Sequence, residues 1–121
     1  MTAEEMAAKI LALMTERRSG VSYVEIVKHV GEEAKGDLAL ELRPNTNLIV
    51  WDGVSQTFAG AMNLLLEGRK IKYRSTSVFV YLADGATLRL PIAKRMPKAG
   101  GFKKPRWVPV VFSLCKAEGG R

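Results

Sequence analysis

The spacing of the apolar residues changes three times along this chain of 121 residues, and these changes constrain its fold most. Apolar residues recur every three or four positions in 6–30 and again in 58–66, which is typical of amphipathic helices. They alternate with polar residues in 38–42 and in 70–74, which is typical of half-buried strands. The sequence therefore predicts an α+β fold in which helices and strands are interspersed.

Two helices are expected in the first thirty residues. The pairs Thr2 with Glu5 and Ser22 with Glu25 have the spacing of a capping box, in which two side chains satisfy free backbone donors at a helix start. Gly31 has the position of a C-terminal cap for the second helix. Several residues of this second run are β-branched and weaken its helix propensity, so a strand is the alternative there.

A β-hairpin and a third helix are expected next. Alternating leucines in 38–42, a cluster of turn residues and the apolar run 48–51 together predict a hairpin over 38–51. Ser55 is then placed to cap the start of a helix, and Gly68 is placed to end it. This third helix has the clearest boundaries of the three.

The remaining residues predict strands, turns and one basic loop. Pro109 has no N–H to give to a strand ladder, so the last strand should lie at an edge or carry a bulge. The length fits a single domain over residues 1–121. In chain order we expect strands at 70–74, 78–82 and 86–90, a mobile basic loop at 93–106, a strand at 107–112 and a frayed tail at 117–121.

Basic residues are concentrated in the second half of the chain. The 19 Lys and Arg residues against 12 Asp and Glu residues give a net charge of +7. Residues 1–60 hold six basic and nine acidic residues, whereas 61–121 hold thirteen basic and three acidic ones, so the two halves carry −3 and +10. Clustered positive charge predicts a polyanionic or acidic partner. A basic surface that binds nothing is the alternative.

Several classes of function have little support in the sequence. The longest apolar stretches are far shorter than the roughly 20 residues that cross a bilayer, and no amphipathic helix accompanies the basic loop, so no membrane partner is expected. One His, one Cys and scattered carboxylates show no catalytic or metal-ligating spacing, so we expect no enzyme, metal or cofactor. The acidic N-terminus and the lone Cys115, expected to be buried, favour a cytoplasmic location.

The order of three helices and a hairpin resembles the winged helix-turn-helix superfamily. Residues 20–27 resemble the segment that enters the second helix of that family. Residues 58–71 resemble the end of a recognition helix that runs into the wing, and residues 78–82 resemble the returning strand of the wing. The resemblance covers residues 3–83 and implies a winged-helix-like three-helix core, a β-hairpin wing and DNA binding.

The chain departs from the winged-helix pattern in three places. Residues 31–54, with their extra hairpin, lie between helices 2 and 3, where the family has a short turn. The expected wing turn at 75–77 is short, and additional C-terminal strands follow the wing. Because the short turn sets the recognition helix against its support, the first departure affects how this helix would meet DNA.

Three elements carry the residues expected to bind nucleic acid. The third helix would present an exposed face with Gln and Asn, which pair with adenine, and with Gly60 for close approach. The cations of strand 70–74 would share one face, while Ile71 and Tyr73 point inward. In the basic segment, Phe102 and Trp107 could stack on bases, and Trp107 could equally be core. The expected contacts are Gln56, Thr57, Asn63, Lys70, Lys72, Arg74, Lys94, Arg95, Lys98, Lys103, Lys104 and Arg106.

These features predict a non-enzymatic domain that binds nucleic acid, with duplex DNA favoured over RNA. Solvated polar and basic faces without a ligand are the alternative for the third helix and for strand 70–74. A protein-interaction adaptor of the same fold, which binds an acidic partner within a larger assembly, is the alternative function. The sequence leaves the oligomeric state and the target sequence open.

Overall fold

The computed structural model describes residues 1–42, 46–93 and 101–115. This part of the chain has four α-helices, a short 3₁₀ helix and six strands, so the fold is mixed α+β as expected. In chain order the elements are α1 (Ala3–Arg17), β1 (Val21–Ser22), α2 (Tyr23–Val30), η1 (Glu32–Ala34), β2 (Lys35–Glu41), β3 (Thr46–Val54), α3 (Gln56–Glu67), β4 (Ile71–Ser75), α4 (Val78–Asp84), β5 (Gly101–Trp107) and β6 (Val110–Leu114).

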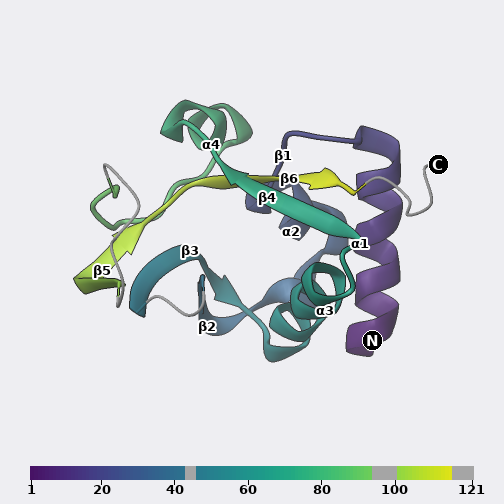
Figure 1. The fold of residues 1–121 in the computed structure, drawn as a ribbon. Coiled ribbons are helices and arrows are strands. Elements are labelled where there is room, and N and C mark those ends of the chain that lie inside the picture. The colour runs from purple at the N-terminus through teal and green to yellow at the C-terminus, as the bar shows by residue number, and fades with distance from the viewer. Residues whose placement is uncertain (43–45, 94–100, 116–121) are drawn as a thin grey trace.

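The strands form two open, three-stranded sheets (Figure 1). The first sheet has the order β1-β6-β4, and both of its pairs are antiparallel. The second has the order β2-β3-β5, in which β2 is antiparallel and β5 is parallel to β3. α1 and α3 lie at one end of the molecule and β5 lies at the other. Each sheet therefore depends on strands that are far apart in the sequence.

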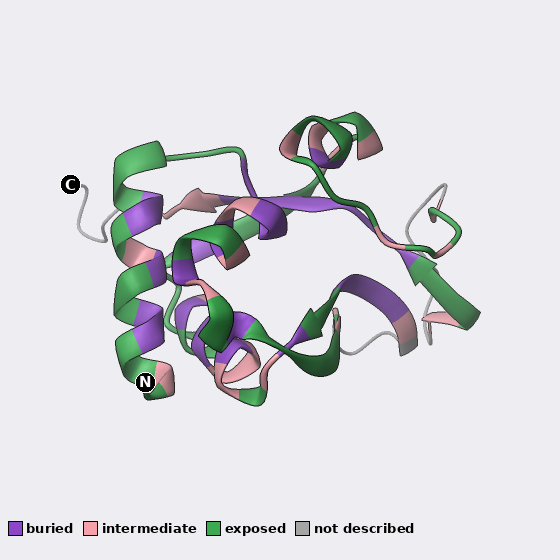
Figure 2. Cartoon of the chain, turned by 180° about the vertical axis from the view of Figure 1, so that it is seen from behind, coloured by how far each residue is buried: buried purple, intermediate pink, exposed green. Residues whose placement is uncertain are grey.

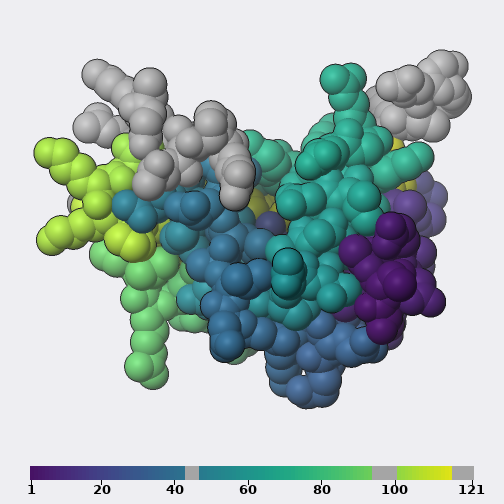
Figure 3. Space-filling view, turned by 90° about the horizontal axis from the view of Figure 1, so that it is seen from below, coloured from purple at the N-terminus to yellow at the C-terminus, as the bar shows by residue number. Residues whose placement is uncertain are grey.

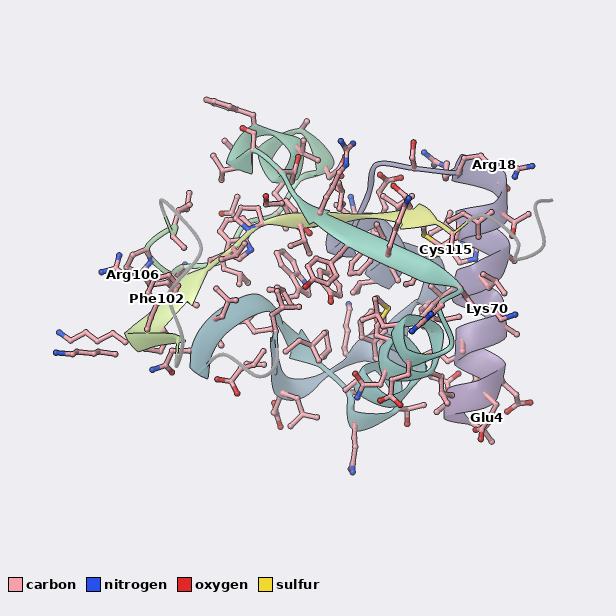
Figure 4. All side chains as sticks on the ribbon, viewed as in Figure 1. Glu4, Arg18, Lys70, Phe102, Arg106 and Cys115 are labelled. Carbon is pink, nitrogen blue, oxygen red and sulfur yellow. The ribbon has the colours of Figure 1, made fainter. Side chains whose placement is uncertain are left out.

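An aromatic cluster lies between the two sheets, where Figure 4 shows side chains filling the space between the ribbons. The ring centroid of Tyr81 lies 5.2 Å from that of Trp51 and 5.2 Å from that of Trp107. The ring centroids of Tyr23 and Phe112 are 4.9 Å apart and nearly perpendicular. These rings belong to one core of buried residues that continues into α1, α2 and α3.

The helix starts follow from their caps. Thr2 and Glu5 form the expected capping box, in which Glu5 N donates to Thr2 Oγ1 at 3.0 Å and Thr2 N donates to Glu5 Oε1 at 2.8 Å. Ser22 Oγ accepts from Glu25 N at 3.3 Å, but the Glu25 carboxylate pairs with Arg17 at 3.0 Å rather than closing a second box. The second run is a helix, and the strand alternative for it is wrong.

The predicted hairpin and third helix are confirmed. β2 pairs with β3, which continues past Trp51 to Val54. α3 begins where Phe58 N donates to Ser55 Oγ at 3.1 Å, and it ends before Gly68. The two elements are adjacent in the chain and in space, so the hairpin stands beside α3 (Figure 1).

The prediction of a strand over 78–82 is wrong, because these residues belong to α4. Ser77 caps this helix, because its hydroxyl accepts a hydrogen bond from Phe79 N at 3.2 Å. Tyr81 is completely buried on the inner side of the helix. Packing of Tyr81 outweighs the strand propensity of the neighbouring valines, a preference that depends strongly on context. The strand expected at 86–90 has no regular structure, and Leu88 and Leu90 instead pack individually against the core.

The prediction of a loop over 93–106 is wrong for residues 101–106, which form β5 together with Trp107. β5 is the outer strand beside β3, and Asn47 Nδ2 donates to Phe102 O at 3.1 Å. An edge strand can keep charged side chains in water while its backbone pairs with the sheet. Residues 94–100 and 117–121 lie outside the described residues, so the rest of the loop and the tail stay predictions.

The single strand predicted over 107–112 is instead two strands. β5 ends at Trp107 in the second sheet, and β6 begins at Val110 in the first. Pro109 lies between them, and its carbonyl accepts from Thr76 N at 2.9 Å. The predicted edge position is wrong for β6, which is the middle strand of its sheet, because Pro109 lies outside the ladder at the crossing point between the two sheets.

Candidate nucleic-acid interface

Three cations follow one another at alternate positions along β4 and just before it. Lys70, Lys72 and Arg74 are all exposed, whereas Ile71 is buried, as the alternation predicts. Alternate residues of a strand lie about 6.6–6.8 Å apart, so the charges form a regular row. Tyr73 differs from the expectation, because its side chain is 45% exposed.

Two further exposed arginines lie near the Lys70 end of this row. Arg18 O accepts from Leu114 N at 2.8 Å, and Lys70 O accepts from Cys115 N at 3.0 Å. The end of β6 therefore joins the end of α1 to the start of β4, and Figure 4 shows Arg18, Cys115 and Lys70 at one end of the molecule. Arg69 is exposed next to Lys70. We call Arg18, Arg69, Lys70, Lys72 and Arg74 the basic edge.

Arg18 and Arg69 are not among the nucleic-acid contacts that the sequence predicts. Each stands in a pair of adjacent basic residues, Arg17-Arg18 and Arg69-Lys70, and these pairs are the sequence feature that could have indicated them. The two pairs are separated by about fifty residues of chain, and the pairing with β6 that unites them is long-range. Cys115, which was expected to be buried, is partly exposed at this junction.

The basic edge has no ion pair with any residue that the structure describes. Within those residues the three ion pairs join Met1 to Glu33, Arg17 to Glu25 and Lys35 to Glu32. Like charges in a row repel one another, and an anionic ligand would relieve this repulsion. A phosphate backbone would also release its condensed counterions on contact.

The basic residues of β5 form a separate group. Lys103, Lys104 and Arg106 are exposed, and the Arg106 guanidinium carbon lies 5.8 Å from the centre of the Phe102 ring. Figure 4 shows Arg106 and Phe102 at the end of the molecule opposite Lys70. The structure therefore does not bring β5 and the basic edge together. Of the remaining predicted contacts, Lys94, Arg95 and Lys98 lie outside the described residues.

Trp107 belongs to the core. Its side chain is 1% exposed and packs against both Trp51 and Tyr81, so the core interpretation is confirmed and stacking on bases is excluded in this conformation. Its indole N–H has no hydrogen-bond partner among the described residues. Phe102, by contrast, is partly exposed and accessible for stacking.

The expected reading face of α3 lies between the start of α1 and a groove. Gln56 and Asn63 are exposed and Thr57 is partly buried. A Cβ atom added to Gly60 would lie 3.4 Å from Ala3 Cβ, so Gly60 faces the start of α1 and not an open groove, and its predicted role in close DNA approach is wrong.

A groove of about 620 Å³ separates the other side of α3 from β2. Figure 3, which views the molecule from below, shows the hairpin in blue beside the teal α3. Two carboxylates, from Glu41 and Glu67, stand in this groove and disfavour the approach of phosphates. The groove is lined by Leu38, Ala39, Leu40, Glu41, Leu42, Ala59, Asn63, Leu66 and Glu67.

Comparisons with known proteins add no relative. No protein-family model, no curated protein and no solved structure matches the chain. None of the described helices is both long and apolar enough to cross a membrane. Over the same part of the chain, no group of three His, Cys, Asp or Glu side chains is placed to hold a metal ion.

Proposed function

We propose that this chain is a winged-helix-like domain that binds duplex DNA through its basic edge. The observation that carries the proposal is the row of exposed cations on β4, which has exposed Arg18 and Arg69 near its Lys70 end and which no described carboxylate neutralises. Contacts of this kind provide affinity for the phosphate backbone without reading the sequence.

The arrangement of the elements supports the winged-helix part of the proposal. Three helices precede the antiparallel pair β4 and β6, and β1 adds to the outer side of β6. The pair would serve as the wing. Its returning strand is β6 and not the predicted 78–82, and residues 76–109, which contain α4 and β5, replace a short wing turn.

Binding is tested by fluorescence anisotropy with duplex DNA, single-stranded DNA and RNA over a series of salt concentrations. Five phosphate contacts predict a log–log slope of about −4.5 for the duplex. Absence of binding at low salt, or binding that salt leaves unchanged, would contradict the proposal. An acidic protein that stays bound after nuclease treatment and competes with DNA for the basic edge would favour the adaptor function instead.

Two triple variants with equal loss of charge locate the interface. Replacing Lys70, Lys72 and Arg74 by Ala should reduce the magnitude of the slope by about 2.7. The matched control replaces Lys103, Lys104 and Arg106 by Ala at the opposite end of the molecule, and should leave the slope nearly unchanged. Equal reductions of the salt slope in the two variants would show that net charge, rather than the basic edge, controls binding.

A further inference from the structure

α4 turns an apolar face toward solvent. Phe79 is 73% exposed and Leu82 is 56% exposed, and their three-residue spacing places them on the same side of the helix. Ala83, beside them, is exposed as well. Figure 2 shows α4 at the periphery of the molecule, with exposed residues on its outer turns. Apolar side chains that are exposed next to one another on one face form a candidate contact surface.

The inner side of α4 is held by hydrogen bonds to distant segments. Tyr81 Oη donates to Val110 O at 2.6 Å and accepts from Tyr23 N at 3.1 Å. Ser22 Oγ donates to Asp84 Oδ2 at 2.6 Å. The two exposed side chains therefore stand on a fixed base, which lowers the entropy lost when they enter a binding partner.

α4 continues directly from the basic edge. β4 ends at Ser75, and α4 begins at Val78 after a connection that Thr76 N secures by donating to Pro109 O at 2.9 Å. Arg74 and Phe79 are five positions apart, so their Cα atoms lie within about 18 Å of each other even if that segment were fully extended. One duplex can therefore contact both.

We infer that Phe79 and Leu82 form a wedge that inserts between neighbouring base pairs and bends duplex DNA held by the basic edge. This inference rests on the proposed function. Proteins that bend DNA commonly insert one or two apolar side chains at a base step while nearby cations hold the phosphates. A second copy of the chain is a poorer occupant, because a stable interface needs about 800 Å² per partner and this face offers three side chains.

The wedge is tested by energy transfer between fluorophores on the two ends of a short duplex that contains a central TA step, which kinks readily. The wild-type chain should bring the ends closer together. F79A/L82A should abolish this bending and bind about tenfold more weakly, while the salt slope stays unchanged because the cations remain. L64A, which removes another exposed leucine, is the matched control and should bend DNA normally.

Thermal melting checks that each variant is folded, which is expected because all three side chains are exposed. Salt-dependent binding by the wild type without bending would overturn the wedge and leave the proposed function intact. The wedge would also be overturned if F79A/L82A bent DNA normally but had lost self-association, or had lost binding to anionic phosphatidylserine vesicles. Failure to bind any nucleic acid would remove the proposed function itself.

Discussion

Tyr81 joins three segments that are distant in the sequence. It belongs to α4, its hydroxyl bonds the backbone of β6 and of the start of α2, and its ring packs against Trp51 of β3. All of these contacts are buried, and the hydroxyl satisfies one backbone donor and one backbone acceptor. The phenol group therefore helps to fix the place of α4 on the first sheet, together with the hydrogen bond from Ser22 to Asp84.

Replacing Tyr81 by Phe should lower the free energy of unfolding by about 1–3 kcal/mol. The change leaves Tyr23 N–H and Val110 C=O buried without their partner, and burial of an unsatisfied group carries its full desolvation cost. Urea denaturation measures the effect. Y73F is the control, because Tyr73 is 45% exposed, and it should change stability by less than about 0.5 kcal/mol. Equal effects from both variants would contradict the role assigned to the hydroxyl.

The same buried phenols predict a loss of stability at alkaline pH. Burial raises the pKa of both Tyr23 and Tyr81 above the ordinary tyrosine value. In the unfolded chain the two phenols ionise near pH 10. Their contribution to the free energy of unfolding is therefore complete below that pH and is lost as the pH rises above it. The free energy of unfolding should fall by about 2.7 kcal/mol per pH unit well above pH 10 from these two groups. Denaturation of Y23F over the same range should show about half of this slope.

Gly36 shows how one position shapes the junction of β2, β3 and α3. A Cβ atom there would lie 2.6 Å from Val54 O and 2.7 Å from Ser55 Cα. The register of the hairpin shifts at this point, since both Lys35 and Leu38 pair with Val54. The irregularity lets η1 approach the start of α3, where Ser55 N donates to Ala34 O at 2.8 Å.

Replacing Gly36 by Ala should therefore destabilise the protein by about 1–3 kcal/mol, because the added methyl group meets backbone atoms that cannot rotate away. The control is G60A on α3. Its methyl group would meet Ala3 at 3.4 Å, a tight contact, and alanine has the higher helix propensity, so stability should hold or rise by up to about 1 kcal/mol. Chemical denaturation of both variants measures the difference, and a G36A variant as stable as the wild type would refute this explanation.

At the scale of the whole molecule, one core connects both sheets and the three longer helices. Trp51 and Trp107 report on the second sheet, whereas far-UV circular dichroism reports mainly on the helices. Because no described element has a separate core, the two signals should give one coincident, two-state transition in urea. Separate midpoints would show that the second sheet unfolds independently of the helices.

Distribution of charge is also a property of the whole molecule. Arg18 and Lys70 of the basic edge lie at one end of the molecule, and Arg106 of β5 lies at the other (Figure 4). Apart from Arg18, the sequence places these residues in the second half of the chain, but it does not show that the two groups are separated in space. A single continuous binding surface was therefore the natural expectation, and the long crossing from β4 through α4 and β5 to β6 separates the two groups.

Local signals predicted much of the fold, whereas long-range pairing decided the rest. Thr2, Ser22 and Ser55 mark helix starts correctly because a cap bonds to a backbone donor only three residues away. Residues 78–82 and 101–106 were predicted wrongly because their structure depends on distant partners. A buried site for Tyr81 produces a helix where the local propensity favours a strand, and pairing with β3 makes a strand of charged residues.

The sequence by itself determined the α+β class, α1 to α3, the hairpin beside α3 and the alternation of cations along β4. These features depend on spacing and capping within a few residues, so they are readable without the partners. The tertiary structure alone decided that the end of β6 bonds to both Arg18 and Lys70, that Gly60 faces α1 and that Phe79 and Leu82 face outward on α4. The physical reason is that strand pairing and burial bring together atoms that the chain separates by tens of residues.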